Sequence, residues 1–244
     1  MKTHHRLWRG IGLLGGVIVL AGLSAPADLL ARSLASTCPS PCRVAAAEGY
    51  WWRGQASLYV QGGPARQWLD LGTLRWQPES GGLRIDVAGG SIRLRPRWAG
   101  LDIDLEAVRL PAELLLAHAG HGLPGSGWGG DVLARSMHLS RPWGNAPLQV
   151  QGDILWLQAS SALLENQPLG DYQLRWQGDG ATPGEGDLST RHGPLQLEGR
   201  LHLAPFHFEG RARLEAAGKP LAKYLDLLGR ADNGVYRISL PPPR

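Results

Sequence analysis

The chain has 244 residues, 43% of them hydrophobic and 19% charged, a balance that excludes intrinsic disorder and allows a sizeable core. The 34 glycines and 18 prolines favour short elements and many turns. The formal net charge is +4, but Lys2, Arg6 and Arg9 at the N-terminus leave 22 of the 25 basic residues against 21 acidic ones in the rest of the chain. No basic cluster stands out there, so no nucleic-acid partner is expected.

The N-terminus combines a short basic segment, residues 1–9, with 18 uncharged residues, Gly10–Ala27. As a helix the uncharged segment is about 27 Å long, enough for a thin bilayer or a tilted span. The basic flank predicts a single-pass anchor with a cytoplasmic N-terminus. A cleavable signal peptide is the alternative, because Ala25-Pro26-Ala27 has small residues at the cleavage spacing. The sequence leaves both open, and either one exports the rest of the chain.

Residues 28–47 form an expected spacer that holds the only two cysteines, Cys38 and Cys42, in a CPSPC turn. A metal site would need a second pair of ligands, which the surrounding sequence lacks. In an oxidising compartment this spacing favours a local disulfide. Because the closed loop is short, the bond is expected to stabilise the fold by at most about 2 kcal/mol.

Residues 48–244 are expected to form a mainly β domain, because apolar and polar residues alternate in one segment after another. Turn signals such as Gly89-Gly90 separate these segments, which predicts an antiparallel sheet with one apolar, buried face and one polar, solvent-exposed face. The alternation is clearest in these apolar sets: Leu83, Ile85 and Val87; Ile92 and Leu94; Leu101, Ile103 and Leu105; Leu195 and Leu197; Leu201 and Leu203.

Two stretches break the period of two and predict short helices. The first is PAELLLAHAG, residues 111–120, with proline at the first turn and glycine at the end. The second is KPLAKYLDLLG, residues 219–229, which places Leu221, Leu225 and Leu228 on one stripe.

A weak internal repeat accompanies these helices. LGTLRWQ, ending at Gln77, is echoed by LGDYQLRWQ, ending at Gln177, and each copy precedes one of the helices. The body is therefore interpreted as two repeat blocks, residues 48–120 and 130–240, joined by a glycine-rich linker.

No pattern in the chain predicts catalysis, a cofactor, a metal or a small-molecule ligand. The Gly-x-Gly-x-x-Gly matches within Gly120–Gly130 follow a helix and lack a phosphate-binding lysine, so they read as the linker. The polar residues that invite a catalytic or metal reading lack partners at the required spacing, and we interpret them as surface residues: His118, His121, Asp102, Asp104 and Ser126.

The segment EGYWWRGQASL resembles the type II secretion system protein N family, which has a Gly-x-x-Trp-x-Gly-x-Ala pattern just after its membrane anchor. LGTLRWQ, LPAELLLAHAG and the terminal GVYRISL also resemble family positions, in the same order. The residues that match the pattern are Gly49, Trp52, Gly54 and Ala56.

The resemblance implies a non-enzymatic subunit of the bacterial inner membrane with a periplasmic main domain, acting with other inner-membrane subunits to export folded proteins. Trp52 is then expected to start the first strand facing inward, and Gly54 to allow a bulge or a close backbone contact. Trp51 is a candidate partner contact. The alternative function is an envelope lipid carrier, or a bridging protein, whose curved sheet would hold acyl chains on its dry face.

Overall fold

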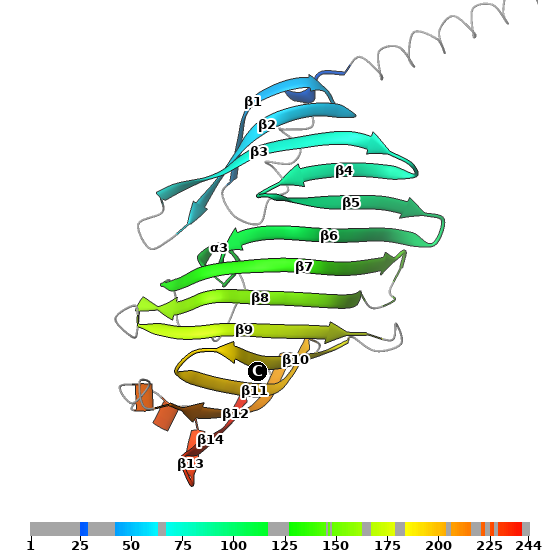
Figure 1. The fold of residues 1–244 in the computed structure, drawn as a ribbon. Coiled ribbons are helices and arrows are strands. Elements are labelled where there is room, and N and C mark those ends of the chain that lie inside the picture. The colour runs from blue at the N-terminus through cyan, green and yellow to red at the C-terminus, as the bar shows by residue number, and fades with distance from the viewer. Residues whose placement is uncertain are drawn as a thin grey trace, which may run out of the picture.

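The computed structural model of the chain describes residues 25–28, 42–62, 67–116, 127–144, 146, 148–162, 167–178, 184–203, 206–215, 221–222, 225–226 and 229–240. Within these residues, fourteen strands form a single antiparallel sheet whose order follows the sequence except that β14 lies between β12 and β13 (Figure 1). The strands are β1 Cys42–Tyr50, β2 Arg53–Gly62, β3 Gln67–Glu79, β4 Gly82–Val87, β5 Gly90–Arg97, β6 Gly100–Pro111, β7 Trp128–Pro142, β8 Gln149–Ser161, β9 Pro168–Gln177, β10 Glu185–His192, β11 Leu195–Leu203, β12 Phe206–Leu214, β13 Gly229–Asp232 and β14 Val235–Leu240.

The alternating pattern therefore predicts the fold class correctly, because nearly every strand is followed by its antiparallel neighbour. Two-residue turns connect several of them. Ala88 and Gly89 have φ values of 50° and 76°, and Asn233 and Gly234 have 49° and 79°. Two successive residues with positive φ match the right-handed twist of the paired strands, which is why glycine follows a small residue or asparagine at both turns.

Both stretches predicted as short helices contain helical residues in the described part of the chain. α3, Ala112–Leu116, follows Pro111, and residues 117–120 of that prediction lie outside the described residues. In the second stretch residues 221–222 and 225–226 are helical, and Leu221 and Leu225 are buried against the sheet. Leu228 lies outside the described residues.

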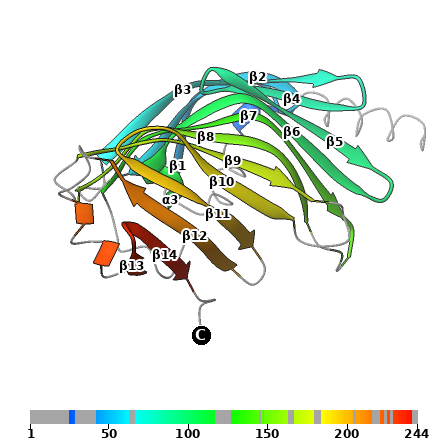
Figure 2. The same ribbon diagram turned by 60° about the horizontal axis from the view of Figure 1, so that its bottom comes forward.

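The sheet is arched, with α3 under the arch, where it contacts β2 as well as β6 and β7 (Figure 2). One face is apolar across the whole sheet, because cross-strand partners share a face. A single cross-strand row on this face connects twelve strands: Gly54, Trp76, Ile85, Ile92, Leu105, Met137, Gly152, Trp176, Gly186, Leu201, Phe208 and Leu240. The opposite face carries the charged residues of the alternation.

Trp76 and Trp176 lie in this row in similar settings. Both indole rings are nearly inaccessible to solvent, at 2% and 3% exposure, and each packs on glycine of a neighbouring strand, Gly54 or Gly186. The same element order follows each tryptophan, namely three strands and then a helical segment. This order supports the two repeat blocks, which remain a proposal because the sheet itself runs on from β6 to β7 without interruption.

The sheet begins at Cys42, six residues before the start expected from the sequence. Cys42 to Ala45 pair with Val60 to Ser57, so the end of the predicted spacer is an edge strand. Among the described residues, no helix is long and apolar enough to cross a membrane. Most of the predicted anchor, up to residue 24, lies outside the described residues.

Candidate functional site

The β1–β2 hairpin holds the family-like motif, and its two tryptophans occupy the turn. Tyr50 pairs with Arg53, which leaves Trp51 and Trp52 as the two connecting residues. Trp52 thus does not start the first strand as expected, because β1 already forms the preceding strand. Its ring stacks on that of Tyr50, with centroids 5.9 Å apart and planes 7° apart. The turn therefore presents an aromatic tip at one end of the sheet.

The glycines of the motif make room for Trp76. Gly54 pairs with both Gly49 and Trp76, and a Cβ atom on Gly54 would lie 2.5 Å from the Glu48 carbonyl oxygen and 2.6 Å from Cζ2 of Trp76. The expected close contact at Gly54 is present, whereas the register shift in β2 falls between Ser57 and Tyr59. Trp76 Nε1 donates a hydrogen bond to the Tyr50 carbonyl oxygen at 3.1 Å.

Ala56 and Ala27 complete this apolar cluster. Ala56 is 2% exposed and Ala27 is 1% exposed, and both pack with Trp76. Residues 25–28 are held at the hairpin by two backbone contacts: Trp51 N donates to the Ala25 carbonyl oxygen at 3.1 Å, and Pro26 forms a bridge with Tyr50. The last residues of the predicted anchor are therefore an integral part of the fold.

Several residues singled out in the sequence lie outside the described residues, namely Cys38, His118, His121 and Ser126. The disulfide with Cys42 stays a prediction. Trp51 is 45% exposed, and its role as a partner contact also stays a prediction.

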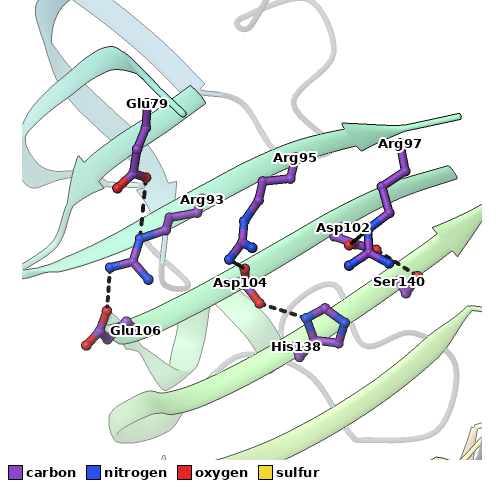
Figure 3. Close-up of polar contacts among 9 residues, drawn as sticks. All are labelled: Glu79, Arg93, Arg95, Arg97, Asp102, Asp104, Glu106, His138 and Ser140. Carbon is purple, nitrogen blue, oxygen red and sulfur yellow. Dashed lines mark hydrogen bonds and ion pairs between the residues drawn. The ribbon is translucent and has the colours of Figure 1, made fainter. Parts of the chain in front are cut away.

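The polar face carries a set of ion pairs across β3 to β7, which we call the charged ladder (Figure 3). In one rung Arg93 lies between two carboxylates, 3.5 Å from Glu79 and 3.1 Å from Glu106. In the next, Asp104 accepts from Arg95 at 2.5 Å and contacts Nδ1 of His138 at 2.7 Å. The third joins Arg97 to Asp102, which also accepts a hydrogen bond from Ser140 at 2.9 Å.

Asp102 is buried, which corrects its interpretation as a solvated surface residue. It is 2% exposed, against 65% for the side chain of its partner Arg97. Its polar partners are Arg97 on β5 and Ser140 on β7, the two neighbouring strands. A buried carboxylate is tolerated only with such partners.

Asp104 is held ionised by its neighbours. Burial disfavours its charged form, but the His138 hydrogen bond and the positive charge of Arg95 outweigh burial and lower its pKa below the ordinary value. A carboxylate with a lowered folded-state pKa stabilises the fold above its ordinary pKa, and this contribution is lost as pH falls through the lowered value. At neutral pH the Asp104 carboxylate is therefore ionised and can accept from Arg95.

The ladder borders a depression of about 1200 Å³ on the polar face. Four arginines and five carboxylates line it, so the charges nearly balance and no strong field for an anion results. Within the described ranges, no group of three or more His, Cys, Asp or Glu side chains could hold a metal ion. Four of the five carboxylates pair with an arginine on a neighbouring strand, an arrangement suited to fixing strand register.

The fold and hairpin define a mainly β protein built on one arched antiparallel sheet with an aromatic N-terminal turn. The chain belongs to the type II secretion system protein N family, whose model matches residues 41–239. The match runs from the residue before β1 into β14, so the whole sheet is the family's domain. No curated protein and no solved structure matches the chain.

The match confirms the resemblance drawn from EGYWWRGQASL and the later motifs. Membership implies a role in type II secretion, in the cell envelope and together with other subunits of that system.

Proposed function

We propose that the chain is a non-enzymatic inner-membrane subunit of the type II secretion machinery. Its single membrane span lies within Gly10–Ala27, whose last residues pack on the β domain. Residues 1–9 lie in the cytoplasm, and the β domain lies in the periplasm beside other inner-membrane subunits. There it supports export of folded proteins across the outer membrane. The family match over the entire sheet carries this proposal. Its test is the distribution of a secreted enzyme in a strain that lacks the chain, where we expect retention in the periplasm.

The packing of residues 25–28 supports a retained anchor over a cleaved signal peptide. Cleavage after Ala27 would remove a residue that is 1% exposed and packed on Trp76, and would also remove the Ala25 carbonyl that accepts from Trp51. Loss of these contacts would uncover part of the apolar cluster at the hairpin.

The mature protein is therefore expected to keep residues 10–27. N-terminal sequencing of the chain extracted from membranes should give the start of the full sequence, or of the sequence without Met1. A mature chain that begins at Asp28 would contradict the anchor and favour a periplasmic protein released from the membrane.

The continuous apolar face favours one second candidate, an envelope lipid carrier. Ile92 and Leu105 are only half-buried on that face, so acyl chains could lie along it. A photo-crosslinker at Ile92 should then yield a phospholipid adduct, whereas one at the next residue, Arg93 on the polar face, should not. Adduct yields that are equal at both positions, or absent at both, would exclude the carrier.

A further inference from the structure

Exposed large hydrophobic side chains gather at one end of the sheet. Because the strands are antiparallel and nearly in chain order, the β1–β2 turn, the β5–β6 turn and the β7–β8 loop lie at the same end, on the right in Figure 1. We call it the hairpin end and define it by residues 50–52, 97–99, 141–144 and 148. Of the seven exposed large hydrophobics among the described residues, five lie there: Tyr50, Trp51, Trp98, Trp143 and Leu148.

Trp98 and Trp143 are the most exposed of these, at 100% and 60%. The loop and turn that carry them are joined, because Trp143 N donates to the Ala99 carbonyl oxygen at 2.9 Å. Both rings therefore project from a fixed backbone. An exposed indole on a rigid turn contributes nothing to the core, and a group of them marks an interaction surface.

Two arginines precede these tryptophans in the chain, at the ends of β5 and β7. Arg97 precedes Trp98 and its side chain is 65% exposed, and Arg141 is exposed at the end of β7. Arg97 is paired with Asp102, but a guanidinium has five N–H donors, so the pair leaves donors for a further anion. Indole and guanidinium groups together suit the headgroup region of a bilayer, where indoles are enriched and arginine meets phosphate.

The uncharged N-terminal segment joins the domain at this same end. Ala25 contacts Trp51 and Pro26 contacts Tyr50, so the C-terminal end of this segment lies at the hairpin end. If Gly10–Ala27 is the membrane span, this end of the sheet is the one nearest the bilayer.

We propose that the hairpin end rests on the phospholipid bilayer that holds the anchor, an inference that depends on the proposed membrane span. Trp98 and Trp143 lie in the headgroup region, and Arg97 and Arg141 contact lipid phosphates. The anchor joins the sheet at the β1–β2 turn, whereas Trp98 follows β5 and Trp143 follows β7. The domain therefore meets the membrane at separate points. The strands then point away from the membrane and place the opposite end of the sheet deep in the periplasm.

The opposite end supplies a matched control. Trp68 is also an exposed tryptophan, at 51%, but it lies near the start of β3. It is eleven residues from Glu79, where β3 ends on the same side of the sheet as the hairpin end. At about 3.3 Å per residue it is about 36 Å from that end. The proposal therefore predicts that Trp68 stays in water.

The test uses the full chain in liposomes of phosphatidylethanolamine and phosphatidylglycerol. In a Cys38→Ser, Cys42→Ser background, single substitutions Trp98→Cys, Trp143→Cys and Trp68→Cys carry an environment-sensitive fluorophore. Flotation first establishes membrane insertion. We expect the probes at 98 and 143 to shift to shorter emission wavelength, to be quenched by lipids brominated near the headgroup, and to lose accessibility to aqueous iodide. The probe at 68 should show none of these changes.

The outcomes separate the two proposals. A chain that does not float with the liposomes overturns the membrane span, and this inference with it. A chain that floats while the probes at 98 and 143 are as open to iodide as the probe at 68 overturns this inference alone. Probes that are shielded from iodide but not quenched by brominated lipid would show that protein covers the hairpin end, which also overturns it. Far-ultraviolet circular dichroism of each variant checks that the sheet is intact.

Discussion

Trp76→Ala is expected to destabilise the domain by about 3–5 kcal/mol, and Trp176→Ala by a similar amount. Both side chains are almost fully buried, in separate apolar clusters of the same sheet face. Glycine on a neighbouring strand gives each ring its site, so no larger side chain is at hand to fill the space left by alanine. Because a domain is stable by only about 5–15 kcal/mol, protein level should fall in the cell. Urea denaturation followed by circular dichroism measures the effect.

Trp68→Ala is the matched control, since the same substitution at a half-exposed ring should change stability by less than about 0.5 kcal/mol. Substitution of each buried tryptophan by phenylalanine separates the contribution of packing from that of the indole hydrogen bond. Trp76 Nε1 donates to the Tyr50 carbonyl, whereas Trp176 Nε1 is buried without a hydrogen-bond partner in the described part of the chain. Trp76→Phe should therefore cost more than Trp176→Phe. Equal costs for the alanine variants at 68 and 76 would contradict the buried row.

Asp102→Ala is expected to destabilise the domain by about 1.5–3 kcal/mol, the range for hydrogen bonds to a charged group. The carboxylate is 2% exposed and interacts with Arg97 and with Ser140 on the other neighbouring strand. Its removal leaves the Ser140 hydroxyl without this acceptor. The measurement is again the denaturation midpoint, compared at neutral pH.

Asp187→Ala provides the comparison, because that carboxylate is 65% exposed and lies 3.8 Å from Arg200 on the same polar face. Exposed pairs of this kind contribute about 0–1 kcal/mol. If the variants at 102 and 187 were equally stable, Asp102 would behave as the solvated residue that the sequence pattern indicates.

The strands were predictable because their signal is local. Leu83, Ile85 and Val87 alternate with polar residues within β4 itself, and a period of two requires one apolar face. The sequence pattern does not predict β1, because this local signal is weak there: Ala45 to Ala47 carry little strand propensity, and a register shift follows Ala45. Without β1 in view, Trp51 and Trp52 could not be placed in a turn.

The candidate site was less predictable because it depends on contacts between distant segments. The motif glycine Gly54 indicated a close approach, but not that the approaching group is Trp76, 22 positions further along. Asp102 reads as one more polar residue of an alternating strand, and its burial arises from the strands on either side. The hairpin end likewise cannot be predicted from local patterns, because the strand order is needed to place residues 51, 98 and 143 at the same end of the sheet.

The central claim is that the chain serves type II secretion from the inner membrane, and the most direct measurement is where a secreted enzyme accumulates. In a strain that lacks the chain, with and without a plasmid copy, enzyme activity is measured in the medium and in the periplasm. The account predicts periplasmic accumulation without the chain, restored export with the wild type or Trp68→Ala, and poor export with Trp76→Ala in proportion to its reduced level. Unchanged export without the chain would contradict the account.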